Sequence, residues 1–308
     1  MPASYAQSAY VQTAEAVRQL GREIMPAVLG SQALYAPQHE MEPYQGVTVR
    51  RDAQYGPHER NRLDVFTPDD GKGPRPVLVF VHGGGFVGGD KKHPGSPYLD
   101  NVALWAARHG MVGVNITYRL APDFTFPAGS QDLASAVHWV REHVAEIGAD
   151  PARIFVMGTS AGAVHVAVYL ANAQFAGERQ GVAGGIMLSG VYDLESLGGD
   201  GMSKSYFGED ESRYGAMSPL PGLLASKIPL MFVLTEHDPP MFEQQALQLV
   251  QAWFERHGQW PELVRLMAHN HLTSTFHLNT DDEVLGNQML AFIERQGAAA
   301  KAEPAMAG

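Results

Sequence analysis

The chain has 308 residues, a hydrophobic content of 45%, no cysteine and a formal net charge of -11 at pH 7. The length and the apolar share fit one large globular unit with a substantial core. The acidic balance excludes a basic nucleic-acid-binding surface, and the lack of cysteine excludes disulfides, cysteine nucleophiles and thiolate metal sites. The start of the chain, Met1–Gln7, shows no signal-peptide pattern, and no apolar run reaches membrane-spanning length, so we expect a cytoplasmic protein without a membrane partner.

The N-terminal part of the chain has a helical pattern and precedes the first strand. Apolar residues recur at helical spacing over residues 9–34, and Gly21 and Pro26 interrupt them, which predicts two helical pieces. Eight apolar segments then predict strands: Val47–Tyr55, Asn61–Thr67, Pro76–Val81, Val112–Tyr118, Arg153–Met157, Gly185–Ser189, Pro229–Thr235 and Leu263–Met267. The Gly56-Pro57 turn between the first two indicates an antiparallel hairpin.

Helical segments separate the later strands. They are Leu99–Ala106, Leu133–Ile147, Ala163–Leu170 and Phe242–His257. Strands that alternate with helices predict an α/β fold, with a mostly parallel eight-stranded sheet and helices on both faces. We expect a single domain, residues 1–308, with its core in 46–193 and 227–296. The segment 194–226 is expected to form loop and short helix, and the Ala-rich tail 297–308 to be disordered.

One stretch, Gly158-Thr159-Ser160-Ala161-Gly162, stands between a buried strand and a helix. A Gly-x-Ser-x-Gly turn in this setting is typical of a nucleophile elbow, so tight that it tolerates little but glycine two positions before and after the serine. The elbow lifts the serine hydroxyl above the sheet and aims the first N–H groups of the helix at the same place. The pattern alone fits a structural turn equally well, so partner residues must decide.

Two further residues follow apolar strands, where parallel sheets gather their sites. Asp238 follows Pro229–Thr235, and His271 follows Leu263–Met267 within His269-Asn270-His271. A neutral imidazole can take the proton of a serine hydroxyl, and a buried carboxylate fixes its tautomer. Asp238 could instead cap the following helix, and loop histidines are usually structural. Their coincidence in the order Ser, Asp, His favours a triad of Ser160, Asp238 and His271.

The run His82-Gly83-Gly84-Gly85-Phe86 follows the strand Pro76–Val81. Consecutive glycines allow backbone N–H groups to turn inward, and such donors stabilise the oxyanion of acyl transfer by about 3–4 kcal/mol each. We expect the donors to be the N–H groups of Gly84, Gly85 and Ala161. The run also matches a dinucleotide-binding pattern, but Pro94 and Pro97 delay the helix that this pattern requires. No cofactor is therefore expected.

The remaining histidines and carboxylates are interpreted as structural. His82 is expected to brace its loop, Asp132 to cap a helix, and His165 to pack beside the elbow helix. His269, His271 and His277 raise the question of a metal site. No carboxylate at ligand spacing joins them in the sequence, so no metal is expected.

Four separated motifs together resemble the hormone-sensitive-lipase-like esterases of the α/β-hydrolase superfamily, over about residues 45–295. They are His82–Phe86, Tyr118–Pro122, Phe126–Ala128 and Gly158–Gly162. The resemblance implies carboxylic-ester hydrolysis without a cofactor, and a small helical lid drawn from 1–45 and 194–226. Leu272 after His271, where the family usually has an aromatic residue, and the short 194–226 segment are closer to the arylformamidase-like branch. In that branch the second His of His-Asn-His or His-Asp-His matches the base, which favours His271 over His269.

We therefore expect a serine esterase that acts on a small-molecule ester of small to medium size. Hydrolysis of an amide or formamide by the same groups is the alternative enzyme reading. A catalytically silent binding protein is a third, which the intact triad and glycine run disfavour. A homodimer is left open, and the acyl and alcohol specificity is not predicted.

Overall fold

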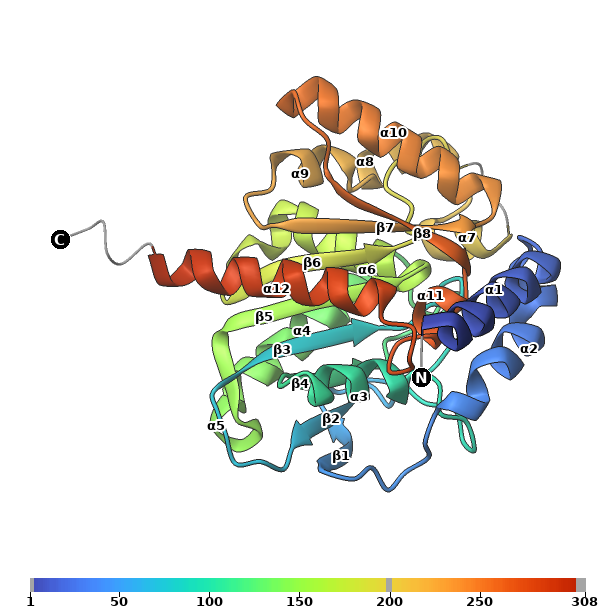
Figure 1. Ribbon diagram of the computed structural model, residues 1–308. Helices are drawn as coiled ribbons and strands as arrows, with labels where there is room; N and C mark the ends of the chain where they lie inside the picture. The colour runs from blue at the N-terminus through green and yellow to red at the C-terminus, as the bar shows by residue number, and fades with distance from the viewer. Residues whose placement is uncertain (1–2, 198–200, 303–308) are drawn as a thin grey trace.

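The computed structural model describes residues 3–197 and 201–302, which surround one eight-stranded sheet (Figure 1). The strands are β1 Val47–Gln54, β2 Arg62–Pro68, β3 Arg75–Val81, β4 Val112–Ile116, β5 Ala149–Thr159, β6 Val182–Leu188, β7 Leu230–His237 and β8 Glu262–Asn270. Their order in the sheet is β1-β2-β4-β3-β5-β6-β7-β8. The pairs β1/β2 and β2/β4 are antiparallel and all other neighbours are parallel. The predicted α/β-hydrolase fold is confirmed.

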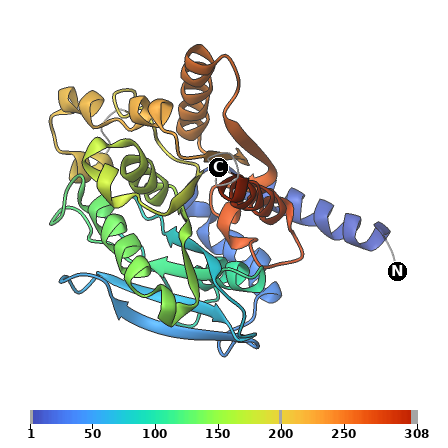
Figure 2. The same cartoon turned by 90° about the vertical axis from the view of Figure 1, so that its left-hand side faces the viewer.

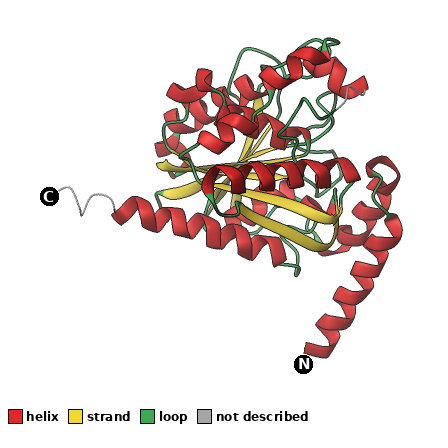
Figure 3. Ribbon diagram, turned by 90° about the horizontal axis from the view of Figure 1, so that it is seen from above, coloured by secondary structure: helices red, strands yellow, loops and turns green. Residues whose placement is uncertain are grey.

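Helices cover both faces of the sheet, as the view from above shows (Figure 3). They are α1 Ala3–Leu20, α2 Ile24–Tyr35, α3 Asp100–Arg108, α4 Ala128–Glu142, α5 Val144–Ile147, α6 Ala161–Ala171, α7 Gly201–Phe207, α8 Tyr214–Met217, α9 Leu220–Ala225, α10 Pro240–His257, α11 Thr273–Phe276 and α12 Val284–Ala302. Short 3-10 turns occupy Ala36–Gln38, Ala173–Glu178 and Glu211–Arg213. No helix among these residues is both long and apolar enough to cross a membrane.

The central strand β3 shows how the sheet builds two cores. Successive side chains of a strand point to opposite faces. Val77, Val79 and Val81 accordingly belong to the buried cluster that also holds residues of α4, α6 and α10, whereas Leu78 and Phe80 belong to the cluster with residues of α3 and α12. All five side chains are almost fully buried, and each contributes about 1.5–3 kcal/mol on burial. The continuous apolar run of this strand follows from its burial on both faces.

The C-terminal helix α12 is a feature that the sequence analysis did not predict. Leu285, Met289 and Phe292 recur at helical spacing and are fully buried against the sheet. The expected disordered tail from Gly297 is wrong in part, because α12 continues to Ala302. Alanine has the highest helix propensity of all residues, so an Ala-rich segment extends a helix that packing has already nucleated. Residues 303–308 lie outside the described part of the chain.

The N-terminal residues form α1 and α2, with the break between them close to Gly21. The helix α2 contacts α11, and α1 contacts β8, so this pair lies at the edge of the sheet where the parallel strands end (Figure 1). The beginning of α1 extends away from the rest of the molecule (Figure 2). The segment 201–225 forms the short helices α7, α8 and α9. Within the expected loop and short helix of 194–226, residues 198–200 lie outside the described part of the chain.

Candidate active site

The turn between β5 and α6 places Ser160 at the carboxyl edge of the sheet. Ser160 has a φ of 54° and a ψ of -122°, a strained conformation typical of a nucleophile elbow. A Cβ at Gly158 would collide with the Gly162 carbonyl, and a Cβ at Gly162 would collide with the Val81 carbonyl. Both glycines are therefore required by close backbone contact. The Ser160 side chain is half-buried, whereas the residues before and after it are buried.

Asp238 lies just beyond β7 and is fully buried. Its Oδ1 accepts a hydrogen bond from His271 Nδ1 at 2.7 Å. Its Oδ2 accepts from Ser189 Oγ and from the Thr235 backbone N–H, each at 2.7 Å. Burial alone would raise the pKa of Asp238, but these hydrogen bonds outweigh burial and lower the pKa below its usual value. The carboxyl group is thus held as a carboxylate beside the imidazole.

His271 follows β8 and is held on three sides. Asp238 fixes its Nδ1 as a donor, so its Nε2 carries the lone pair. Phe242, on α10, stacks on the imidazole with 4.5 Å between ring centroids. The Ser274 hydroxyl donates to the His271 carbonyl at 2.8 Å and fixes the backbone of the loop. Among the described residues the buried Nε2 has no hydrogen-bond partner, Ser160 included.

His269 has different partners, although it lies only two residues earlier. Its Nδ1 meets Thr273 Oγ1 at 3.2 Å, and its Nε2 lies 3.2 Å from Asp282 Oδ2. Neither Ser160 nor Asp238 is among its partners in the described part of the chain. The geometry therefore brings Asp238 to His271 and keeps His269 in a separate contact.

The glycine run after β3 has the backbone geometry expected of an oxyanion loop. Gly84 has a φ of 125° and Gly85 a φ of 59°, values that glycine adopts without strain. Within the described residues, no protein acceptor pairs with the N–H groups of Gly84, Gly85 or Ala161, the first residue of α6. A Cβ added at Gly85 would touch the sulfur of Met202, which lies on α7. A segment after the sixth strand thus reaches the glycine run His82–Phe86.

The start of this loop is held by two buried rings. The His82 imidazole stacks on Tyr118 with 4.4 Å between centroids, and the Tyr118 hydroxyl donates to the His82 carbonyl at 3.1 Å. His165, on α6, contacts Tyr118 edge to face and is also buried. Burial lowers the pKa of His82 to about 4 and that of His165 to about 3, so both are neutral packing residues.

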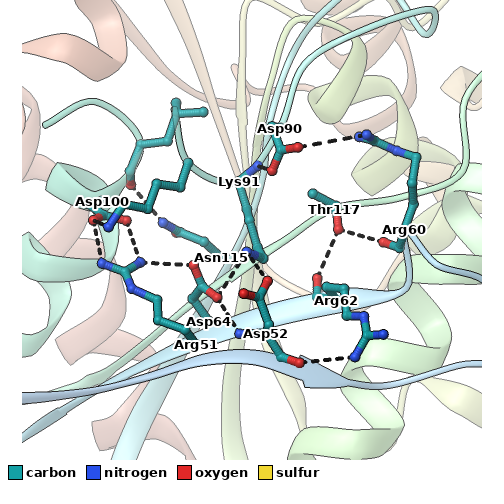
Figure 4. Close-up of polar contacts among 12 residues, drawn as sticks. Arg51, Asp52, Arg60, Arg62, Asp64, Asp90, Lys91, Asp100, Asn115 and Thr117 are labelled. Carbon is teal, nitrogen blue, oxygen red and sulfur yellow. Dashed lines mark hydrogen bonds and ion pairs between the residues drawn. The ribbon is translucent and has the colours of Figure 1, made fainter. Parts of the chain in front are cut away.

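Ion pairs and a charged hydrogen-bond donor fix the end of this loop, at Gly89 and Lys91 (Figure 4). Arg60 donates to the Gly89 carbonyl at 2.8 Å. Lys91 Nζ lies 2.8 Å from Asp52 and 3.0 Å from the fully buried Asp64. Burial would lower the pKa of Lys91, but the two carboxylates outweigh burial and raise it. Because the loop is fixed at both ends, its N–H groups can stabilise an oxyanion with little reorganisation.

A second charge centre in Figure 4 joins β1 to the start of α3. Arg51 bridges the buried carboxylates of Asp64 and Asp100, at 2.9 Å and 2.6 Å. Lys92 reaches Asp100 at 3.3 Å from the segment that follows the oxyanion loop. Breaking a buried ion pair from one side leaves an uncompensated charge, so this network resists displacement of the loop.

The N-terminal helices touch the residues around His271 directly. Arg22, between α1 and α2, donates to the Asp238 carbonyl at 2.6 Å and forms an ion pair with Glu243. Ser31, on α2, accepts from the Asn270 side chain at 3.0 Å. His39 lies 2.7 Å from the Phe276 carbonyl. The segment before the first strand is therefore part of the wall around the site.

Sequence reasoning missed Ser189 and Phe242, which support the Asp238–His271 pair. Ser189 follows β6, so the rule that polar residues at strand ends build the site could have found it.

The expected capping role of Asp132 is wrong. The helix α4 begins after Pro127, so Asp132 lies inside it. The Asp132 carboxylate accepts from the Arg119 backbone N–H at 2.7 Å and from its guanidinium at 2.9 Å.

The expectation that no carboxylate lies near the group of His269, His271 and His277 is wrong. His271 does not belong to this group, because it pairs with Asp238. Asp282 lies beside His269 instead, because the turn before α12 brings its carboxylate there. His269, His277 and Asp282 are the group of described residues that could hold a metal ion.

Comparison with known proteins places this geometry in a family. The family model BD-FAE matches residues 63–251, more than half of the chain. The chain belongs to the BD-FAE family. The matched residues include the glycine run His82–Phe86, the Gly158–Gly162 turn and Asp238, and they stop before the loop that carries His271. The eight-stranded, mostly parallel sheet of this BD-FAE chain is that of an α/β-hydrolase.

Relatives of this BD-FAE chain include the esterase LipQ of Mycobacterium tuberculosis, 31% identical over 238 residues, or 74% of this chain and 53% of LipQ. A probable isoprenylcysteine α-carbonyl methylesterase of Arabidopsis thaliana is 37% identical over 119 residues, 39% of this chain and 24% of the relative. The chain thus spans between a quarter and about half of the length of these two relatives. A solved bacterial heroin esterase is 25% identical with a TM-score of 0.67, over 92% of this chain and 96% of that chain.

Proposed function

We propose that this protein is a serine carboxylesterase that hydrolyses small to medium carboxylic esters through an acyl-enzyme. The observation that carries the proposal is the buried pair of His271 and Asp238, at the same edge of the sheet as the elbow serine. The esterase relatives support ester hydrolysis as the reaction class.

In the acylation step, Ser160 Oγ attacks the carbonyl carbon of the ester. His271 Nε2 takes the hydroxyl proton, and Asp238 stabilises the imidazolium that forms. The contact between Ser160 and Nε2 is not among the hydrogen bonds of the described residues, and catalytic contacts often tighten only when substrate binds. The tetrahedral oxyanion accepts hydrogen bonds from the N–H groups of Gly84, Gly85 and Ala161. Collapse of this intermediate breaks the ester C–O bond, and His271 gives its proton to the departing alcohol.

Deacylation repeats these roles with water as the nucleophile. His271 Nε2 removes a proton from the water, whose oxygen attacks the acyl carbon, and the carboxylic acid leaves as Ser160 regains its proton. The depressed pKa of Asp238 suits this cycle, because a carboxylate is needed each time the imidazole becomes charged.

We also propose that the N-terminal helices and the α7–α9 segment act as the lid over this site. Arg22 and Ser31 contact the loops of Asp238 and His271, and Met202 covers Gly85. A lid excludes water and shapes the space for the acyl group. Met202 is half-exposed and flexible, so it would admit a short acyl chain while narrowing the way for a long one. A homodimer and a cytoplasmic location remain predictions.

A substrate panel tests the proposal. Purified protein is assayed with p-nitrophenyl esters of increasing acyl length and with N-formyl anilides, with Ser160→Ala as the control. We expect turnover of the short and medium esters, a steep decline for long chains, and no turnover by the variant. Faster cleavage of formyl anilides than of any ester would replace the esterase by the amide or formamide hydrolase. A wild-type protein inert on every substrate would refute both.

A further inference from the structure

Three side chains of types that bind metal ions lie close together beside the loop of His271, outside the proposed catalytic centre. His269 is the second-last residue of β8, His277 follows α11, and Asp282 lies in the turn before α12. One ligand atom from each lies within 4.8 Å of the other two, and the two imidazole centroids are 4.3 Å apart. Both histidines are buried, and the Asp282 side chain is 16% exposed.

Thr273 contacts both imidazoles. His277 Nδ1 lies 2.6 Å from the Thr273 carbonyl, which can only accept, so this nitrogen carries the proton and Nε2 carries the lone pair. His269 Nδ1 lies 3.2 Å from Thr273 Oγ1, which also accepts from the Asn270 backbone N–H at 2.9 Å. The other nitrogen of His269 faces Asp282, whose carboxylate accepts a hydrogen bond from the ring.

One lone pair of this group has no partner. His277 Nε2 is buried with no hydrogen-bond partner among the described residues, and it faces the pair of His269 Nε2 and Asp282 Oδ2, which lie 3.2 Å apart. A metal ion that replaces the proton between His269 and Asp282 would bind both imidazoles and the carboxylate at once. The bond from His277 Nδ1–H to a backbone carbonyl is the usual second contact of a metal-ligating histidine.

We propose that His269, His277 and Asp282 form a binding site for a divalent transition-metal ion of the Zn²⁺ type. Two imidazoles and one carboxylate suit zinc, which takes four ligands in a tetrahedron. With bonds of about 2.0 Å, the edge of such a tetrahedron is about 3.3 Å. The distance of 3.2 Å between His269 and Asp282 fits this edge, and the third ligand closes the site by moving about 1.5 Å at most.

The site also has a path of entry. A cavity of about 420 Å³ is lined by Asp282 together with Trp105, His109 and Asn279–Asp281. Metal can reach Asp282 from this cavity, and water there can supply the fourth ligand. The ion would join β8, α11 and the start of α12, the segment that also carries His271. Its role is therefore to fix the catalytic histidine loop from behind.

Metal content of the full chain tests the site directly. The protein is incubated with zinc, desalted and analysed by elemental mass spectrometry. We expect one zinc per chain in the wild type, and more than about 100-fold weaker binding by His277→Gln and Asp282→Asn, since losing even an outer-shell partner costs about 10–100-fold. The matched control is His138→Gln, because His138 and Glu142 form an exposed pair at the same distance of 3.2 Å. Its zinc content should equal that of the wild type.

Thermal melting gives a second readout that does not need a variant to fold. Zinc at about 100 times its Kd should raise the melting temperature by about 3–6 °C, and chelator should reverse the rise. If the cluster holds only a proton shared by His269 and Asp282, the desalted wild type contains no zinc and melts at the same temperature with zinc and with chelator. That result overturns the proposal, as does a zinc content unchanged in a folded Asp282→Asn variant.

Discussion

Replacing Asp238 with asparagine tests how the carboxylate controls His271. Oδ2 accepts two hydrogen bonds, from Ser189 Oγ and from the Thr235 backbone N–H, while Oδ1 faces His271. An asparagine side chain has one oxygen and one NH₂ group. Since the Thr235 N–H can only donate, the amide oxygen must take the Oδ2 position and the NH₂ group must face the imidazole.

This orientation reverses the tautomer of His271. Its Nδ1 must now accept from the amide, so the proton moves to Nε2 and the ring cannot take a proton from Ser160. In a serine protease the equivalent change lowers kcat about 10⁴-fold. We expect Asp238→Asn to lower kcat by about 10³–10⁴-fold, or about 4–5.4 kcal/mol at 1.36 kcal/mol per factor of ten.

The assay is the initial rate on a short p-nitrophenyl ester, with a thermal melt to show that each variant is folded. Ser189→Ala is the matched control, because it removes one hydrogen bond to Oδ2 but keeps the charge and the contact with His271. We expect this control to lose at most about 10-fold in kcat, within the worth of a hydrogen bond to a charged group. An Asp238→Asn variant that stays within 10-fold of the wild type, about 1.4 kcal/mol, refutes the tautomer argument.

Three further predictions follow from the same geometry. Gly84→Ala should lower kcat about 10²–10³-fold, because a Cβ there meets the backbone of Gly88 and displaces an oxyanion donor; a variant with normal kcat would remove Gly84 from that role. His271→Ala should abolish ester turnover while His269→Ala keeps most of it, and stopped assays of both variants would expose a reversal of roles. Burial lowers the pKa of His165 to about 3, so this imidazole stays neutral in the folded protein at pH values where it is protonated in the unfolded chain. The free energy of unfolding should therefore decrease as the pH falls below about 6.5. The slope contributed is about 1.4 kcal/mol per pH unit, and denaturant titrations from pH 6.5 to 4.5 should show His165→Gln with a shallower decline; an unchanged slope contradicts the assignment.

The sheet and the positions of Ser160, Asp238 and His271 in it could be predicted because they depend on local pattern. Buried parallel strands are continuously apolar, and the first residues after them lie at one edge. The elbow glycines add a steric requirement that is visible in the sequence, and the structure shows its cause in the close backbone contacts of Gly158 and Gly162.

Contacts set by packing between distant segments could not be predicted in this way. Asp282 reaches His269 only because the turn before α12 folds back, and Asn279 there has a positive φ of 65°. Asp132 lies inside α4 and binds Arg119, because the start of that helix is fixed by Pro127 and not by a capping side chain. The helix α12 has a readable apolar stripe, but its extension through the Ala-rich tail depends on the buried part that precedes it.

The identity of the nucleophile is the central claim, and covalent labelling measures it most directly. The native protein is treated with a fluorophosphonate, digested, and the modified peptide is sequenced by mass spectrometry. We predict one adduct, on Ser160 Oγ, formed in parallel with the loss of ester turnover and absent from Ser160→Ala. An adduct on another residue that accompanies the loss of turnover, or a Ser160→Ala variant that still hydrolyses ester, would contradict the account.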